Sequence, residues 1–287
     1  VLPLEYPCHG IGDYREACLR ITDVHGASAC DLRYVSHRII SGKPELKGLP
    51  HTFPSEPQPC ETLEITLRDD SADFEVLLRY SIFDGLPAIA RSVTVTNTGS
   101  DKLVLQRAYS ACAEFDRADF DMITLSGSWA RERIPERYPI HRGKQSVDSL
   151  RGCSSHQHNP FAVLCGRHTT EDFGEAYGFS LVLSGSFTML AEVTQHDRTR
   201  LVMGVNDTDF SWTLESGGSF TAPEAVMVYS ESGLSGMSRT FHDLWRSHII
   251  RSRYKDVRRP VLINCWEAAY FDFDSEKLLD LARKAAP

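Results

Sequence analysis

The stretch TLEITLR-DDSAD-FEVLLRY, residues 62–80, decides the fold class of this chain. Apolar and polar side chains alternate over residues 62–68, and an apolar run that ends on an aromatic residue follows at 74–80. Alternation with a period of two predicts a half-buried β-strand. The triplet DDS between the two runs is made of typical turn residues. The stretch therefore predicts two neighbouring strands joined by a turn.

Comparable runs continue along the chain, rich in β-branched and aromatic residues and separated by Gly, Asn, Asp and Ser. They lie at residues 90–97, 103–105, 177–183, 188–193, 200–205 and 225–229. No helical pattern separates these runs from one another. Many strands without intervening helices predict a mainly β fold, an antiparallel sandwich, rather than repeated β-α-β units.

The pattern changes near Ser232, where apolar residues take the spacing of one amphipathic helix. A polar, basic connection follows at residues 251–260. The apolar run PVLIN, residues 260–264, predicts a strand buried on both faces, and Asp274 can cap a helix after it. One such β-α unit cannot bury its strand alone, so we expect it to begin an α/β domain.

Composition excludes several classes of protein. The chain has 287 residues, of which 41% are hydrophobic and 24% charged, so a packed core is expected rather than disorder. Its net charge of −8 argues against a nucleic-acid-binding surface. It has no apolar run long enough for a membrane span, and its opening, VLPLEYPCHG, is not a signal peptide. Since it neither starts with Met nor ends at a natural boundary, we expect a piece of a longer protein.

The cysteines are scattered singly and form no C-x-x-C pair, which excludes zinc-knuckle and thioredoxin-like motifs. Several lie in apolar runs, so we expect buried, reduced thiols that pack as small hydrophobic side chains. Together with the missing signal peptide, this favours a reducing cytoplasm. The eight are Cys8, Cys18, Cys30, Cys60, Cys112, Cys153, Cys165 and Cys265.

Three patterns resemble functional sites only weakly. His156 and His158 would share one face of a strand, as metal ligands do, but no third ligand lies nearby and a polar loop is favoured. The charged residues 131–133, with Arg137, indicate a solvated or subunit-facing salt-bridge network rather than an anion site. Ser36 and His37 are adjacent on an expected strand and so point to opposite faces, which disfavours a nucleophile–base pair.

The segment NCWEAAYFDFD, residues 264–274, is the richest in candidate chemistry. It begins at the carboxyl end of the expected buried strand, which is where α/β barrels place their active sites. Trp266 there would offer a flat apolar surface to the C–H face of a sugar. Glu267, Asp272 and Asp274 are candidate sugar ligands or acid/base groups. The alternative is structural: Asp274 caps a helix, and the aromatic residues pack.

The sequence resembles glycoside hydrolase family 36 α-galactosidases over nearly all of its length. The resemblance rests on PVLIN followed by WEA and YFDF at residues 260–273, and on motifs spread in order before it. These are GDYRE at 12–16, DLRYVSHRI at 31–39, GKP at 42–44, GLP at 48–50, LSGSWARE at 125–132 and SSHQHNPF at 154–161. Three positions depart from the usual family residues: Cys265 replaces Asn, Cys153 replaces a small residue, and Ala269 replaces Thr. The Cys265 difference lies beside Trp266 and affects the expected substrate preference.

The resemblance implies three parts for this chain. An N-terminal β-supersandwich, antiparallel and truncated at its start, would occupy residues 1–231. A linker helix and connection would occupy residues 232–259, and the beginning of a truncated (β/α)8 catalytic barrel would occupy residues 260–287. The bacterial and fungal branch that it resembles forms tetramers, so a homotetramer is the implied assembly of the full-length protein.

The implied activity is retaining hydrolysis of terminal α-1,6-galactosides of the melibiose and raffinose type, with no metal or organic cofactor. Retention requires two carboxyl groups about 5–5.5 Å apart. The family carries both as Asp on later barrel strands, so this chain would hold no catalytic residue and would be inactive alone. No nucleic-acid or membrane partner is expected, and the expected location is the cytoplasm.

For individual residues, the resemblance implies that Trp266 binds substrate. It also implies that Arg33, Tyr34, His37 and Lys43 belong to an interface that helps to wall a neighbouring subunit's active site. Two alternatives remain open for the function. The chain could be a non-catalytic sandwich that binds sugar or drives oligomerisation, or part of a relative with α-N-acetylgalactosaminidase or galactosyl-transfer activity.

Overall fold

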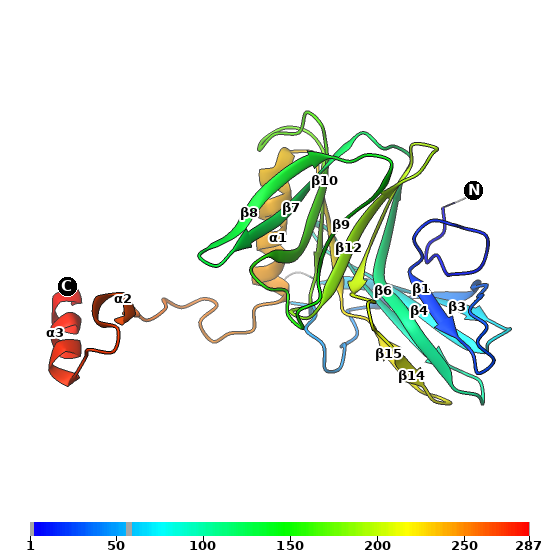
Figure 1. Ribbon diagram of the computed structural model, residues 1–287, viewed down its shortest axis with the longest axis horizontal. Coiled ribbons are helices and arrows are strands. Elements are labelled where there is room, and N and C mark those ends of the chain that lie inside the picture. Colours follow the sequence, from blue (N-terminus) through cyan, green and yellow to red (C-terminus); the bar gives the residue numbers. More distant parts are fainter. Residues whose placement is uncertain (1–2, 56–58, 287) are drawn as a thin grey trace. The chain divides into compact units, whose positions relative to one another are not determined.

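The computed structural model describes residues 3–55 and 59–286. The chain divides into two units, Val1–Ile249 and Ile250–Pro287, and each is described separately. The larger unit is built from antiparallel sheets, and the smaller one contains short helices (Figure 1).

The larger unit contains a ten-stranded antiparallel sheet with the order β2-β3-β4-β5-β16-β11-β10-β7-β8, and β15 also pairs with β5. These strands are β2 (Arg33–Ser41), β3 (Cys60–Asp69), β4 (Phe74–Phe83), β5 (Leu86–Asn97), β7 (Phe120–Ser128), β8 (Arg131–Pro139), β10 (His158–Gly166), β11 (Ala176–Leu181), β15 (Ser219–Thr221) and β16 (Ala225–Ser230).

A smaller sheet has the order β1-β6-β13-β12, with β14 also on β6, and β9 lies beside β12. Its five members are β1 (Leu19–Thr22), β6 (Leu103–Phe115), β12 (Phe187–Val193), β13 (Thr199–Val205) and β14 (Trp212–Leu214), and the neighbouring β9 spans Gly143–Ser149. The predicted strands at 62–68 and 74–80 are confirmed within β3 and β4. The turn between them forms because a carboxylate oxygen of Asp69 accepts hydrogen bonds from the backbone N–H groups of Ser71 and Ala72, at 2.8 and 2.9 Å.

The two sheets enclose the main core, which confirms the predicted sandwich. Alternate residues of β4, such as Phe74 and Val76, point inward and are fully buried with Leu105 of β6. A second cluster joins β7, β10, β12 and β13. Period-two alternation is therefore the local cause of the fold, since it places one apolar face of each strand between the sheets.

Helix α1 (Gly233–His248) covers part of the other face of the large sheet, and confirms the helix predicted after Ser232. Met237, Phe241 and Leu244 form its buried stripe and pack on β11 and β16. Gly178 of β11 makes room for this helix, because a Cβ added there would lie 2.5 Å from a ring carbon of Phe241.

The smaller unit contains α2 (Trp266–Ala269) and α3 (Ser275–Ala285). The predicted cap is confirmed, because Asp274 accepts a hydrogen bond from the backbone N–H of Lys277 at 2.8 Å. The strand predicted at residues 260–264 is wrong for this chain: Val261 and Leu262 are exposed, and no strand forms there. A strand buried on both faces needs neighbouring strands, and residues 3–55 and 59–286 supply none.

All eight cysteines are free thiols. Six are buried, as predicted, whereas Cys153 is exposed in the turn before β10 and Cys265 is partly exposed. The expectation of burial is therefore wrong for Cys153, since this part of the chain lies outside the packed strands. In the described part of the chain, no helix is long and apolar enough to cross a membrane.

Candidate functional site

Trp266 opens helix α2 in the smaller unit, where its backbone N–H donates a hydrogen bond to Oδ1 of Asn264 at 2.9 Å. The indole packs edge-to-face against Tyr270 and Phe271, with ring centroids 5.4 and 4.9 Å apart. It is nevertheless 44% exposed. The arrangement is a small aromatic platform with part of the indole open to a ligand, as a sugar-stacking residue requires.

Some of the carboxylates around this platform have structural roles. Asp274 caps α3, which supports the structural interpretation over an acid/base role for this residue. Oδ2 of Asp272 forms an ion pair with Nζ of Lys277 at 3.2 Å. Glu267 lies in the first turn of α2, where a negative charge is favourable. The segment therefore supplies an aromatic surface, and its carboxylates mainly organise the local chain.

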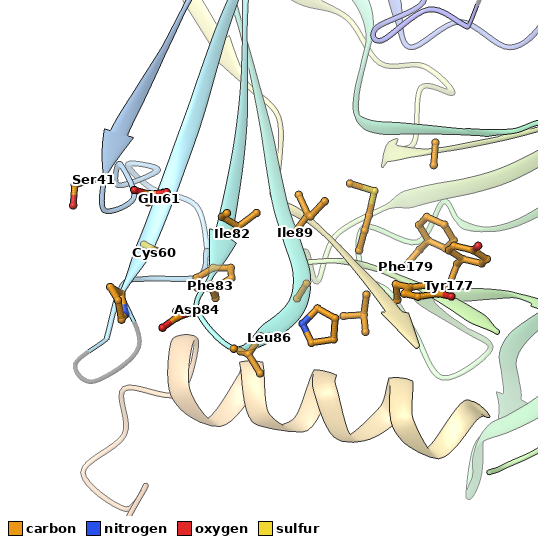
Figure 2. A pocket seen from close by; sticks show the side chains of 18 of the residues that line it. Ser41, Cys60, Glu61, Ile82, Phe83, Asp84, Leu86, Ile89, Tyr177 and Phe179 are labelled. Atoms are coloured by element: carbon orange, nitrogen blue, oxygen red, sulfur yellow. The ribbon is translucent and has the colours of Figure 1, made fainter. Parts of the chain in front are cut away.

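A cavity of about 770 Å³ in the larger unit opens between β3–β5, β6, β11 and β16 (Figure 2). Its lining is mainly apolar and aromatic, with Ile82, Phe83, Ile89, Tyr177 and Phe179 pointing into it. A galactose ring carries a hydroxyl on most of its carbons, and such groups need buried hydrogen-bond partners. This lining offers few of them, so the cavity suits an apolar occupant better than a sugar.

The polar groups of Tyr177, at the edge of this cavity, are engaged elsewhere. The Tyr177 hydroxyl lies 3.1 Å from Oε2 of Glu175 and donates to it. Burial, and then the nearby carboxylate of Glu175, raise the pKa of Tyr177 to about 12. The phenol therefore stays neutral in the physiological range and acts as a hydrogen-bond donor.

Strand β2 carries three of the four residues predicted for a subunit interface. Arg33, Tyr34 and His37 are exposed, and the Tyr34 hydroxyl lies 2.6 Å from Nδ1 of His37. Arg33 pairs with Asp31 at 2.8 Å. The β2–β3 register shifts between Tyr34 and Ser36, an irregularity that changes where the β2 side chains point.

Lys43 does not share the β2 surface. Its ammonium lies 2.6 Å from a carboxylate oxygen of Glu224, and these side chains are only 4% and 1% exposed. The other oxygen of Glu224 accepts a hydrogen bond from the backbone N–H of Thr52 at 2.7 Å. Lys43 therefore helps to fasten the chain after β2 to the sandwich, and its charge is not available to a neighbour.

At the opposite edge of the same sheet, β8 exposes residues 131–133, so these side chains are solvated as expected. Trp129, at the tip of the β7–β8 hairpin, is 83% exposed. Arg137 instead binds within its own chain, 2.7 Å from Asp121 and 2.7 Å from the carbonyl oxygen of Thr169. The two edge strands of the large sheet, β2 and β8, are thus both open to solvent along their length.

The two histidines near β10 lie in different local structures, so the loop interpretation holds for His156 and is wrong for His158. His156 is in a turn, whereas His158 starts β10 and places its Nδ1 2.8 Å from the carbonyl oxygen of Asp148. Among the residues that the structure describes, no group of three His, Cys, Asp or Glu could hold a metal ion.

The sequence interpretation missed a buried ionic network on the smaller sheet. Arg200, whose side chain is 1% exposed, binds both Asp13 and Glu114, and Arg15 bridges the same two carboxylates. Nearby, Arg107 pairs with Glu16 and with Asp207 at 2.5 Å. The only signal in the sequence is the GDYRE motif at 12–16, because its partners lie on strands far away in the chain.

Burial alone would raise the pKa of Asp13, but hydrogen bonds from Arg15 and Arg200 outweigh it and hold that pKa far below the usual range. Asp207 behaves alike: burial opposes ionisation, yet the hydrogen bond and charge of Arg107 lower its pKa. Both carboxylates are therefore fixed as anions. They stabilise the position of residues 13–16 through ion pairs and do not act as proton donors.

Comparison with known families matches two models to the chain. Residues 1–215 match the glycosyl hydrolase family 36 N-terminal domain, and residues 219–287 match the melibiase family.

Among curated relatives, α-galactosidase AgaA of Geobacillus stearothermophilus is 47% identical over 98% of this chain and 39% of its own length. The bifunctional α-galactosidase/sucrose kinase AgaSK of Mediterraneibacter gnavus is 44% identical over 99% of this chain and 30% of its own length. The chain thus spans at most about two fifths of these relatives.

Solved structures give the same picture. The crystal structure of AgaA superimposes with a TM-score of 0.95 over 98% of this chain and 39% of that one. A variant of AgaA in complex with raffinose is 46% identical and also has a TM-score of 0.95, with the same coverage. The α-galactosidase of Lactobacillus brevis is 38% identical, with a TM-score of 0.95 over 98% of this chain and 38% of that one.

Proposed function

Since the chain belongs to glycosyl hydrolase family 36, we propose that it is the sandwich-bearing part of a retaining α-galactosidase that hydrolyses terminal α-1,6-galactosides. The observation that carries the proposal is the 47% identity to an α-galactosidase over 98% of the chain, with a TM-score of 0.95. Raffinose and stachyose complexes of AgaA variants support the melibiose and raffinose class of substrate. The division at residues 231 and 259 remains part of the proposal.

In this proposal, Trp266 contacts the galactoside and the two catalytic carboxylates come from outside residues 1–287. The partly exposed indole would stack on the apolar face of the sugar. Asp272 pairs with Lys277 and Asp274 caps α3. These local roles support the proposal that the catalytic acids lie outside this chain. The chain's own contribution is then binding and support, and hydrolysis needs the remainder of the enzyme.

The proposal is tested by replacing Trp266 in the full-length enzyme. Trp266→Ala removes the stacking surface, and we expect kcat/KM for melibiose to fall. The fall should correspond to a loss of at most about 3 kcal/mol of transition-state stabilisation. Trp212→Ala is the matched control, because Trp212 is 49% exposed but lies on β14 of the sandwich. An unchanged kcat/KM in Trp266→Ala would remove this residue from the substrate site.

A second assay addresses activity of the chain itself. The 287-residue chain should show no turnover of a chromogenic α-galactoside, whereas the full-length enzyme should hydrolyse it. Clear turnover by the chain alone would contradict the absence of catalytic carboxylates. Binding of galactosides to an inactive full-length protein would instead favour the alternative of a non-catalytic binding module. Preference for N-acetylgalactosaminides or for transfer would favour the second alternative, a relative with one of those two activities.

We further propose that the full-length enzyme is a homo-oligomer, a tetramer, that uses the surface of β2. Exposed β-strand edges invite pairing or packing with another chain, and β2 is exposed over all but one residue. Its apolar side chains include Ile39, which is 69% exposed. A cytoplasmic location is also proposed, and the eight free thiols support it.

A further inference from the structure

Four of the eight cysteines belong to one core cluster of the sandwich. Cys8, Cys18, Cys30 and Cys112 are each at most 9% exposed. They are grouped by the fold and not by the sequence, in which no two of them are close. They have no assigned role in the buried ionic network on the smaller sheet or in the proposed galactosidase function.

Cys8 and Cys30 lie on two segments that run beside each other. The backbone N–H of Cys30 donates to the carbonyl oxygen of His9 at 3.0 Å. The Cys8 thiol lies 3.0 Å from the carbonyl oxygen of Cys30, and the Cys30 thiol lies 3.6 Å from that of His9. Each sulfur therefore rests against the other segment's backbone, and the two thiols are within hydrogen-bonding reach of each other.

The pKa values of the two thiols shift in opposite directions. A hydrogen bond from the Cys30 thiol lowers the pKa of Cys8, and this outweighs the opposite effect of burial. The same interaction, together with burial, raises the pKa of Cys30. Since the thiolate is the nucleophile in disulfide exchange, the direction of these shifts favours Cys8 as the attacking group.

We propose that Cys8 and Cys30 form a redox modification site, a dithiol that closes to an intrachain disulfide when it meets a small-molecule disulfide of the glutathione type. The Cys8 thiolate attacks one sulfur of that disulfide, forms a mixed disulfide and releases one thiolate. The Cys30 thiol loses its proton and attacks the Cys8 sulfur, which releases the second small thiol. Two protein thiols lose two electrons and two protons, and the oxidant disulfide becomes two thiols.

Access favours this pair over the other one. His9, Gly10 and Asp31, next to Cys8 and Cys30 in the chain, are exposed, so this pair lies beside surface residues. Cys18 and Cys112 also lie close to each other, since the Cys18 thiol is 3.8 Å from the carbonyl oxygen of Ala111. Cys18 is fully buried and Cys112 lies within β6, so their oxidation requires opening of the sandwich itself.

The consequence of oxidation is a covalent tie between the segment before β1 and the loop before β2. The tie closes a loop between residues 22 positions apart and reduces the conformational freedom of the unfolded chain. Oxidation should therefore raise the temperature of half-unfolding without changing the fold. The inference is independent of the proposed galactosidase function.

The test is to incubate the folded 287-residue chain with oxidised glutathione, block remaining thiols by alkylation and map disulfides in non-reduced peptides. We expect a peptide that links Cys8 to Cys30, with a loss of the mass of two hydrogen atoms. Recovery of both residues as alkylated thiols, or a Cys18–Cys112 link in place of Cys8–Cys30, would overturn the proposal.

Variants supply a second readout. Cys30→Ala should abolish both the cross-link and the oxidation-dependent rise in unfolding temperature. Cys165→Ala is the matched control, because Cys165 is equally buried but lies in β10 within another cluster, and it should keep both effects. A rise of equal size in Cys30→Ala would show that another modification causes it. Because mapping of the unsubstituted chain needs no variant, a folding defect in Cys30→Ala leaves the test decisive.

Discussion

Several charged side chains are buried in the sandwich, and some of them form ion pairs with one another. Lys43 and Glu224 are the clearest case, since they lie 2.6 Å apart and are almost fully buried. Removing one member of a buried pair leaves the other charge without compensation, which costs about 3–5 kcal/mol. Replacing both by uncharged groups costs much less.

We therefore expect Lys43→Met to lower the free energy of unfolding in urea by roughly 3 kcal/mol. The double variant Lys43→Met with Glu224→Gln should recover much of that loss, since no unpaired charge remains. Lys47→Met, which alters an exposed lysine of the same loop, should leave the unfolding midpoint unchanged. Equal midpoints for Lys43→Met and Lys47→Met would show that the buried pair contributes nothing.

At the scale of elements, helix α1 depends on a missing side chain in β11. A Cβ on Gly178 would lie 2.5 Å from a ring carbon of Phe241 and 2.7 Å from the sulfur of Met237. Gly178→Ala should therefore shift the helix and cost about 1–3 kcal/mol of stability. In Gly185→Ala the nearest atom would be 3.5 Å away, an ordinary contact, so this control should unfold like the unsubstituted protein. Thermal unfolding of both variants decides the point.

The edge strand β2 leads to a different prediction, about assembly. In the full-length enzyme, Ile39→Lys places a charge on the exposed strand surface and should reduce the sedimentation coefficient by breaking an interface. Val24→Lys changes an exposed apolar residue in the loop before β2 and should leave the assembly intact. Sedimentation of Ile39→Lys as the same species as the unsubstituted enzyme would exclude β2 from the interface.

For the whole molecule, acid should act through the ionic network on the smaller sheet. The pKa values of Asp13, Glu16 and Asp207 are lowered in the folded protein, because arginine and lysine partners outweigh the effect of burial. The folded state therefore binds protons more weakly than the unfolded state. The stability that these groups contribute is complete above their unfolded pKa values, about 4, and is lost as the pH falls toward their lower folded values.

Urea unfolding measured at decreasing pH should accordingly show a steep loss of stability below about pH 4. Asp13→Asn should make that dependence shallower, since one of the perturbed groups is gone. Asp84→Asn changes an exposed carboxylate and should leave the dependence as it is. The same slope in Asp13→Asn as in the unsubstituted chain would contradict the assigned role of this carboxylate.

The sequence by itself determined the elements whose cause is local. Alternation fixed β3 and β4, helical spacing fixed α1, and Asp274 fixed the start of α3, because each depends on residues a few positions apart. Its motifs also indicated the family. Only the tertiary structure decided which distant residues meet: Lys43 with Glu224, Arg200 with Asp13, and Cys8 with Cys30.

The tertiary structure also decided that residues 260–264, apolar enough for a buried strand, form none in this chain. Backbone N–H and C=O groups of a strand are satisfied by neighbouring strands, which a local pattern can suggest but cannot provide. Long-range pairing depends on how the whole chain is arranged, and so the partners of a side chain or a strand are properties of the fold.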